Sequence, residues 1–190
     1  MNVYLSKLIF LSLLVLSCQS PEKNSVSCIK GSQKPINTLI APSGTNIVSR
    51  FRTPKNCTRE KISIKSFAHY LRNIKLKPYG SEVSYYNGDK KTNKNIYVGV
   101  FDLAIGDKNL HQCADAVMRL HAEHLWKQKR YEDIHFNFTN GFTVNYSEWM
   151  KGKRMNIQGN NTSWNNRYQP SNTYEDFWSY MELILSLIHI

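Results

Sequence analysis

Two nearby stretches decide the fold class: NLHQCADAVMRLHAEHLW, residues Asn109–Trp126, and IHFNFTNGFTVNY, residues Ile134–Tyr146. The first places apolar residues at helical spacing and predicts a helix over residues 108–129. The second alternates apolar and polar residues on both sides of Asn140-Gly141, which is a strong signal for a tight hairpin turn. We therefore expect an α+β fold in which a central helix packs on an antiparallel sheet.

Residues upstream of the central helix predict a short helix and three strands. The stretch EKISIK, residues 60–65, alternates polar and apolar residues as a half-buried strand does. Ser66 is suited to cap the short helix that follows. The stretches EVSYY and NIYVGVFDLAI, residues 82–86 and 95–105, predict two further strands around a polar loop.

Residues downstream of the hairpin predict two more helices. A short helix is expected around Trp149, followed by a loop rich in Asn and Gly. Thr173 then begins a pattern close to a capping box, because an acidic residue stands three positions later, and a final helix is expected after it. Together these elements predict a single α+β domain over residues 45–190.

The N-terminal residues have the pattern of an export signal. Lys7 precedes the apolar run Leu8–Leu16, which is too short to span a bilayer as a helix and fits a secretory signal. The Ser17-Cys18 pair resembles the end of a bacterial lipobox, in which cleavage leaves the cysteine as a lipid-carrying N-terminus. Residues 1–17 are thus expected to be a lipoprotein signal peptide. Plain secretion or an uncleaved anchor are the alternatives.

This signal implies a location in the cell envelope. A lipid on Cys18 would hold the protein on a membrane surface, facing the periplasm or the cell exterior, without spanning the membrane. Residues 18–44 are rich in Ser, Pro, Asn and Lys and show no sustained periodicity. They are expected to form a flexible tether between the lipid and the domain.

The cysteine count bears on which thiol is free. The chain has four cysteines: Cys18, Cys28, Cys57 and Cys113. Lipid on Cys18 leaves three, and an odd number in an oxidising compartment leaves at least one thiol unpaired within the chain. Pairing of Cys28 with Cys57 is the most economical arrangement and leaves Cys113 free, although spacing does not fix the connectivity.

Charge and aromatic content indicate the kinds of partner that the domain could bind. The formal net charge is +11, and nucleic acid is not an expected partner outside the cytoplasm. The positive electrostatic field of such a domain would attract peptidoglycan, another anionic envelope polymer or lipid head groups. A solvated basic surface without a partner is the alternative. Aromatic residues could stack on sugars or belong to the core. The most prominent are Trp149, Trp164, Tyr168 and Tyr174.

Three stretches resemble a known family in order along the chain: FAHYLRNIKLKPYGSEV, FDLAIGDKNLHQCADAVMRLHAEHL and YEDIHFNFTNGF. They are similar to the bacterial lipoprotein family called domain of unknown function 4846, over about residues 47–180. That family in turn resembles papain-like, NlpC-type cell-wall hydrolases, because its members usually continue into a stretch with Gly-Asp-Val and Gly-His-Ala. The resemblance implies a papain-like fragment here.

The C-terminal residues depart from the family pattern around Met181. The last six residues, LSLIHI, look like translated adapter sequence. The domain is therefore expected to be truncated, with the stretch that would carry a catalytic histidine absent. The alternative is a natural short form that ends in an apolar helix.

Cys113 has three possible roles. A cysteine nucleophile reacts as the thiolate, which a helix N-terminus and a neighbouring imidazole favour, and in the papain-like layout the cysteine opens the central helix. A small core residue packed with Val117 and Leu120 is the second role. As a metal ligand it would join His111, His121 and His124, but Cys113 and His124 are about 16 Å apart along a straight helix. We therefore expect no metal site and no cofactor, and surface positions for His121 and His124.

His135 is the candidate catalytic partner of Cys113 within this chain. Strand alternation sends Ile134 and Phe136 to one face and His135 to the other, so His135 is available for hydrogen bonding. Cys113 is expected within the first two turns of the central helix, facing the sheet, with that helix packed on the His135 strand. Direct contact between the two side chains is not expected unless the strand twists. Asp102 and Asp115 are candidate orienting carboxylates, or a surface group and a cap.

Two functions of different classes follow. The first is an envelope lipoprotein that acts as a papain-like cysteine hydrolase or amidase on cell-wall material, with Cys113 and His135 as the catalytic pair. The second is a non-catalytic envelope lipoprotein that binds a polymer or a partner protein through its basic and aromatic surface. Reactivity of Cys113 toward a thiol probe would discriminate between them.

Overall fold

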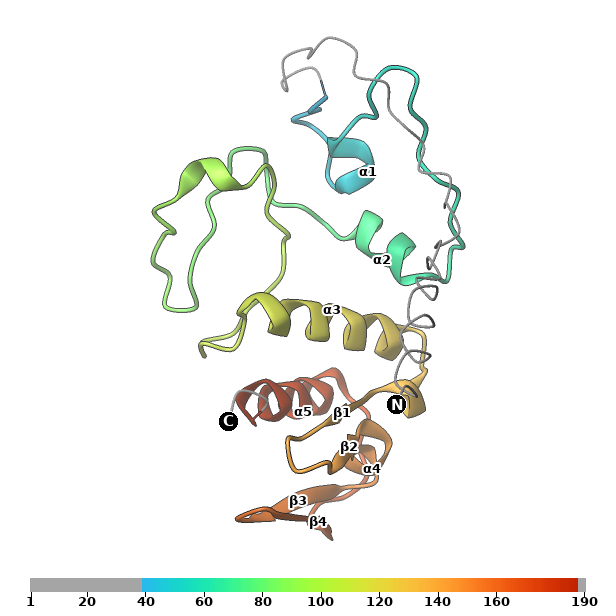
Figure 1. The fold of residues 1–190 in the computed structure, drawn as a ribbon, viewed down its shortest axis with the longest axis vertical. Coiled ribbons are helices and arrows are strands. Elements are labelled where there is room, and N and C mark those ends of the chain that lie inside the picture. Colours follow the sequence, from blue (N-terminus) through green and yellow to red (C-terminus); the bar gives the residue numbers. More distant parts are fainter. Residues whose placement is uncertain (1–38, 188–190) are drawn as a thin grey trace, which may run out of the picture. The chain divides into compact units, whose positions relative to one another are not determined.

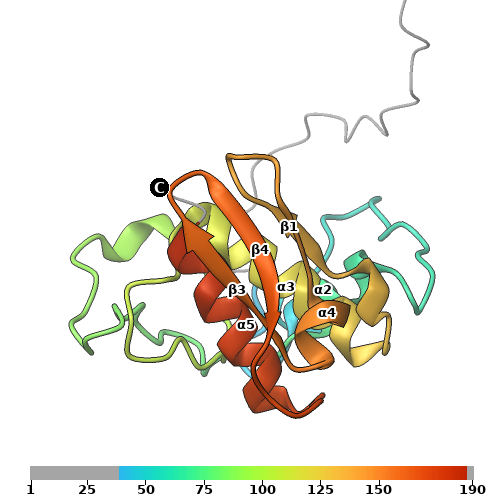
Figure 2. The ribbon, with the colours of Figure 1, turned by 90° about the horizontal axis from the view of Figure 1, so that it is seen from below.

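The structure, a computed structural model, describes residues 39–187, and Figures 1 and 2 show them from two directions. The predicted signal peptide, most of the predicted tether, Cys18 and Cys28 lie outside the described residues. The elements in chain order are α1 (Ile47–Arg50), α2 (Phe67–Asn73), η2 (Lys94–Ile96), α3 (Cys113–Lys127), η3 (Tyr131–Asp133), β1 (His135–Asn137), β2 (Thr143–Asn145), α4 (Tyr146–Met150), β3 (Lys153–Gln158), β4 (Asn161–Asn166) and α5 (Tyr174–Leu187).

Two antiparallel hairpins accompany the helices, which confirms the predicted α+β class. β1 pairs with β2 so that Phe136 lies opposite Val144, as the alternation in this stretch predicts. The connecting turn contains Gly141 with a φ of +82°, a left-handed conformation that glycine adopts without strain. β3 pairs with β4 and places Met155 opposite Trp164.

The β3–β4 hairpin stands where the Asn and Gly content predicts a loop, so that prediction is wrong. Its strands are largely polar, and side-chain contacts with the β1–β2 hairpin hold them in place. Trp164 packs on Phe142 with ring centroids 5.8 Å apart, and Asn140 donates to the Thr162 hydroxyl at 2.9 Å. Composition misses such a strand because backbone pairing needs few apolar side chains once one face is anchored.

α5 supplies much of the buried core. Its residues Phe177, Tyr180 and Ile184 are completely buried. The Tyr180 hydroxyl donates to the Val144 carbonyl at 2.7 Å, and its ring packs on Phe136 of β1 with centroids 6.3 Å apart. Burial of each such side chain contributes about 1.5–3 kcal/mol of transfer free energy. α5 is therefore the helix that covers the β1–β2 hairpin.

α3 packs between α2 and α5, which corrects the expectation that the central helix lies on the antiparallel sheet (Figure 1). On one side, Phe67 of α2 packs against His124 with ring centroids 5.5 Å apart. On the other side, Trp126 packs against Phe177 of α5 at 5.6 Å. α5 takes the place on the hairpin because its buried face is apolar, whereas the buried face of α3 carries charged side chains.

The buried face of α3 also differs from the predicted one. The expected stripe begins with Cys113 and Val117, yet Cys113 is exposed and Val117 is 61% exposed. The buried stripe instead contains Asp115, Arg119 and Glu123, which recur at the same four-residue helical spacing. The prediction failed because it assigned the inward face by hydrophobicity alone, and here paired charges occupy that face.

The three strands predicted upstream of α3 do not form. Residues 60–65, 82–86 and 95–105 contain only turns, one 3-10 turn and isolated bridges. None of the apolar residues that suggested strands is fully buried, and Ile64 and Val98 are 79% and 60% exposed. Their alternation therefore reflects no buried sheet face, because a strand needs a paired neighbour and a packed face to be stable.

Three helix predictions are confirmed. Ser66 caps α2, since its hydroxyl accepts a hydrogen bond from the His69 N–H at 3.1 Å. Thr173 caps α5, since its hydroxyl accepts from the Asp176 N–H at 3.3 Å. Trp149 lies in the short helix α4. α2 and α5 begin where these side-chain oxygens accept from amide groups that have no partner within the first helical turn.

Residues 39–44, which composition assigned to the tether, are hydrogen-bonded to the segment that follows. The Ala41 N–H donates to the Arg50 carbonyl at 2.7 Å. The Arg50 side chain is only 2% exposed and donates to the carbonyls of Gly44 at 2.7 Å and Lys77 at 3.1 Å.

None of the helices within residues 39–187 is both long and apolar enough to cross a bilayer.

Candidate functional site

Cys113 is the first residue of α3, so the prediction that it lies in the first two turns of the helix is confirmed. It is an exposed free thiol, so the prediction that it faces the sheet is wrong. Cys57 is disulfide-bonded, while its expected partner Cys28 lies outside the described residues. Cys113 therefore has the exposure that a nucleophile needs, but lacks the buried packing of a core residue.

His135 is exposed at the start of β1, on the face opposite the buried Ile134, as strand alternation predicts. Within the described chain, no hydrogen bond joins its imidazole to the Cys113 thiol. Cys113 begins α3, whereas β1 follows the far end of that helix, and 15 residues at 1.5 Å each make the helix about 22 Å long. The structure does not assemble these two side chains into a dyad.

The two candidate orienting carboxylates have structural roles. Asp115 accepts a hydrogen bond from the Gln112 N–H at 2.9 Å and closes the capping box of α3. Asp102 forms a surface ion pair with Lys75 at 2.9 Å, and that pair lowers the pKa of Asp102. Neither arrangement orients an imidazole toward Cys113. No cluster of three or more His, Cys, Asp or Glu side chains that could hold a metal ion is present in residues 39–187.

His124 is buried rather than a surface imidazole, which corrects the prediction for this residue. It is 5% exposed and lies against the rings of Phe67 and Tyr70, with centroids 5.5 and 5.4 Å away. Burial, together with the charges of His121 and Arg130, lowers the pKa of His124. His121 is exposed, as predicted. The helix surface was misjudged because α2 covers this part of α3.

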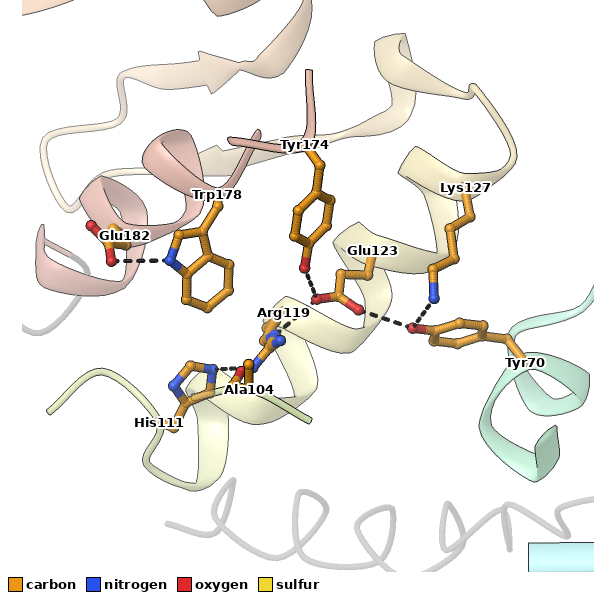
Figure 3. A network of polar contacts seen from close by, with 9 residues as sticks. All are labelled: Tyr70, Ala104, His111, Arg119, Glu123, Lys127, Tyr174, Trp178 and Glu182. Carbon is orange, nitrogen blue, oxygen red and sulfur yellow. Dashed lines mark hydrogen bonds and ion pairs between the residues drawn. The ribbon is translucent and has the colours of Figure 1, made fainter. Parts of the chain in front are cut away.

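A buried polar network centres on Glu123 of α3 (Figure 3). Arg119 Nε donates to Glu123 Oε1 at 2.9 Å, one helical turn away, and both side chains are 4% exposed. The Tyr174 hydroxyl of α5 donates to the same oxygen at 2.9 Å, and the Tyr70 hydroxyl of α2 donates to Oε2 at 3.1 Å. Burial and then the Glu123 charge raise the pKa of Tyr70, so its hydroxyl stays a donor.

Arg119 extends this network to the segment before α3. Its Nη1 donates to the Ala104 carbonyl at 2.6 Å and lies 2.9 Å from His111 Nε2. The Trp178 ring of α5 covers the guanidinium at 4.6 Å. Arginine N–H groups only donate, so His111 Nε2 must accept and the ring must be neutral. Burial and then the Arg119 charge lower the pKa of His111 accordingly.

The Arg119–Glu123 ion pair at the centre of this network is closed to substrates. Glu123 accepts from three donors, and both members of the ion pair are covered by side chains of α2 and α5. A buried pair whose groups are all satisfied holds elements in register but offers no free group for chemistry. We therefore assign Arg119 and Glu123 to the joining of α2, α3 and α5.

An open groove lies along the side of α5 opposite the residues that contact the Arg119–Glu123 network. It has a volume of about 730 Å³ and is lined by α4, β3, the segment after β4, and α5. Arg154 lies in it between two rings, with its guanidinium carbon 3.6 Å from the Trp149 centroid and 4.6 Å from the Tyr168 centroid. The lining residues are Trp149, Arg154, Arg167, Tyr168, Gln169, Asp176 and Ser179, here called the aromatic groove.

Gly152 determines the shape of the aromatic groove. Its carbonyl accepts the N–H groups of Arg167 and Tyr168 at 3.2 and 3.0 Å, which brings the segment after β4 onto the end of α4. Its φ is +86°, and a Cβ at this position would overlap the Tyr168 carbonyl. Glycine is therefore required both for the turn and for the close approach of the two backbones.

A second, smaller cavity of about 410 Å³ lies between α2 and α3. Several of its polar groups already have partners. Lys75 pairs with Asp102, and Lys127 lies over the Tyr70 ring at 4.9 Å. Tyr70 itself donates to Glu123. These side chains are therefore committed to contacts within the protein.

Sequence reasoning found only part of this site. Trp149 and Tyr168 were singled out as possible sugar-stacking residues, and both line the groove. Arg154 and Arg167 were missed because the basic residues are spread along the whole chain. The signal that could have found them is Gly152, a glycine between a helix and a strand, which marks the point where the backbone turns and another segment approaches.

The fold and the site define a mixed α+β domain with a closed ion-pair network and an open aromatic and basic groove. The chain belongs to the family described as domain of unknown function (4846), whose model matches residues 47–188. No curated protein and no solved structure matches the chain.

Proposed function

We propose that this protein is an exported lipoprotein of the cell envelope that binds a saccharide-containing polymer, such as peptidoglycan, without cleaving it. The observation that carries the proposal is the aromatic groove, where the exposed Tyr168 ring lies over the Arg154 guanidinium and Arg167 is a further lining residue. Aromatic rings stack on the apolar faces of sugars, and arginines bind carboxylates and phosphates through paired donors. The net charge of +11 would attract an anionic polymer.

The proposed location rests on the N-terminal pattern. Lipid on Cys18 would place the domain on a membrane surface, facing the periplasm or the cell exterior, so that it meets the envelope polymer rather than nucleic acid. Export with lipidation predicts that the protein partitions into the detergent phase and that Cys18→Ala moves it to the aqueous phase. Unchanged partitioning of Cys18→Ala would remove the lipid from the proposal.

Binding can be tested by co-sedimentation of the full-length protein with purified cell-wall sacculi. Tyr168 is 64% exposed, so Tyr168→Ala is expected to fold normally and to weaken binding. Tyr85→Ala is the matched control, because Tyr85 is 50% exposed and lies outside the aromatic groove. Equal binding by both variants and the wild type would contradict a role for the groove.

A cysteine hydrolase is the second candidate function, and the exposed free thiol at the first position of α3 favours it. The resemblance to papain-like, NlpC-type hydrolases supports the same view, since there the nucleophile opens the central helix. The thiol has no imidazole partner within residues 39–187, so the chemistry would need a histidine brought near it in the working protein. Cell-wall hydrolysis that Cys113→Ser abolishes would establish this function in place of the first.

A further inference from the structure

We propose that the aromatic groove recognises an anionic group, a carboxylate or a phosphate, attached to the sugar that stacks on Tyr168. This inference rests on the proposed function and specifies the chemistry of its ligand. Arg167 and the indole N–H of Trp149 are the groups that would bind the anion. Arg154 is a positioning residue, because its Nη1 donates to two carbonyls and its Nη2 lies beside the Asp176 carboxylate.

Arg154 and Arg167 differ in how their charges are used. The Arg154 guanidinium donates to the carbonyls of Trp149 at 3.1 Å and Lys153 at 2.7 Å, and it lies 3.5 Å from the Asp176 carboxylate. The Arg167 side chain is exposed and makes no hydrogen bond or ion pair with any residue that the structure describes. Arg167 is therefore the uncommitted cation of the groove.

The backbone holds Arg167 in place even though its side chain is free. Its N–H donates to the Gly152 carbonyl at 3.2 Å, and the neighbouring Tyr168 N–H donates to the same oxygen at 3.0 Å. A fixed backbone lowers the entropy cost of ordering the side chain when a ligand binds. The groove is thus preorganised for an acceptor that reaches Arg167 and the Tyr168 ring together.

Trp149 supplies a second uncommitted donor. The residue is 6% exposed, and its Nε1–H is buried without a hydrogen-bond partner in the described chain. A buried indole N–H normally has an acceptor, because leaving it unpaired is unfavourable. Indole can only donate, so its partner must be an acceptor, which a water molecule or a ligand carboxylate, phosphate or hydroxyl oxygen can supply.

The charge balance of the groove favours one negative group. Arg154 and Arg167 line it together with a single carboxylate, Asp176, which leaves one net positive charge. Asp176 is held by Arg154 and by the Thr173 hydroxyl, which donates to it at 3.3 Å, so it is not free to neutralise Arg167. A neutral polymer would leave Arg167 without a counter-charge, and an apolar ligand would also leave the indole N–H unpaired.

The Tyr168 ring places this anion on a sugar rather than on a bare ion. One face of the ring lies against Arg154 at 4.6 Å, yet the residue remains 64% exposed. The remaining ring surface is open for stacking, which a pyranose offers and a free phosphate does not. The anion can come from the carboxylates of peptidoglycan or from the phosphates of a polyol-phosphate polymer.

Binding of the full-length protein to three preparations tests this inference: native sacculi with attached polymers, sacculi freed of phosphate polymers by acid, and such sacculi with their carboxylates also amidated. Arg167→Gln is expected to weaken binding by about tenfold or more, the usual effect of losing a charge-assisted hydrogen bond, and Arg167→Lys to restore part of it. Arg52→Gln, an exposed arginine outside the groove, is the matched control and should bind as the wild type does.

The outcomes separate this inference from the proposed function. Loss of binding when phosphate polymers are removed identifies phosphate, and loss only on amidation identifies carboxylate, and either supports the inference when Arg167→Gln also weakens binding. Equal binding to all three preparations, unaffected by Arg167→Gln, overturns the inference but leaves polymer binding in place. Failure of the wild type to bind any preparation overturns the proposed function itself.

Discussion

The Tyr70 hydroxyl donates a hydrogen bond to Glu123 at 3.1 Å, although 53 positions separate the two residues in the sequence (Figure 3). This contact joins α2 to α3, and the Tyr174 hydroxyl joins α5 to the same carboxylate at 2.9 Å. One buried acidic side chain therefore connects three helices. Glu123 lies on the buried face of α3, and a prediction from hydrophobic spacing alone therefore assigned the wrong face of this helix to the interior.

Replacing Glu123 by Gln should destabilise the fold strongly. The variant leaves the Arg119 guanidinium buried without its counter-charge, and breaking a buried pair in this way costs about 3–5 kcal/mol. The free energy of unfolding in urea measures the loss. Lys75→Gln is the control, since it breaks the ion pair with Asp102, whose side chains are 73% and 40% exposed, and it should leave stability nearly unchanged. Equal losses of stability in the two variants would contradict the assignment of Arg119 and Glu123 to the joining of α2, α3 and α5.

Stability should fall as the pH decreases through about 6.5, the pKa of histidine in an unfolded chain. Burial and the Arg119 charge lower the pKa of His111 in the folded state, so below this pH the unfolded chain binds a proton that the folded protein resists. Burial of His124 acts in the same direction. The urea midpoint should therefore be lower at pH 5.5 than at pH 7.5.

His111→Gln isolates the contribution of His111 to that pH dependence. The glutamine side-chain oxygen can still accept from Arg119, but the side chain does not titrate. The drop in urea midpoint between pH 7.5 and 5.5 should become smaller and not vanish, because His124 remains. An unchanged drop would show that the folded protein does not resist protonation of His111.

Gly152→Ala should destabilise the protein more than Gly80→Ala does. Both glycines have a left-handed φ, +86° and +84°, so backbone strain is similar in the two variants. Only at Gly152 would the new Cβ overlap another backbone group, the Tyr168 carbonyl, whereas nothing lies within 4 Å at Gly80. The difference between the two unfolding free energies reports the close approach, and equal losses would show that this approach is not constrained.

Within residues 39–187, Cys113 should be the thiol that a chromogenic thiol reagent labels in the folded protein, because it is exposed and free while Cys57 is disulfide-bonded. The non-catalytic account predicts the labelling rate of an ordinary exposed thiol, and loss of that labelling in Cys113→Ser. A rate far above that of a small-molecule thiol at neutral pH would instead indicate an activated nucleophile and favour the hydrolase.

Local signals in the sequence predicted the elements whose causes are local. Ser66 and Thr173 mark helix starts because their hydroxyls satisfy amide groups within three residues. Gly141 marks the β1–β2 turn because of its positive φ. The stretch 95–105 was misread, since its apolar alternation has no buried face to match. Alternation predicts a strand only where a partner strand exists, and that information is not local.

The candidate site was predicted only in part for a similar reason. Cys113 was correctly placed at the start of a helix, but its distance from His135 depends on how α3 packs, which spacing does not report. Arg154 and Arg167 line the same groove because β4 returns the chain to Gly152. A groove assembled from four separate segments leaves no contiguous pattern in the sequence.

The central claim, polymer binding in the aromatic groove, is tested most directly by the indole N–H resonances of the protein during titration with soluble, anionic cell-wall fragments. The chain has four tryptophans, and Trp149→Phe assigns the Trp149 signal. Because the Trp149 N–H is buried and unpaired, it should shift downfield as it gains an acceptor, with no such shift in Arg167→Gln at the same fragment concentration. Fragment binding that leaves the Trp149 resonance unmoved would place the ligand elsewhere and contradict the account.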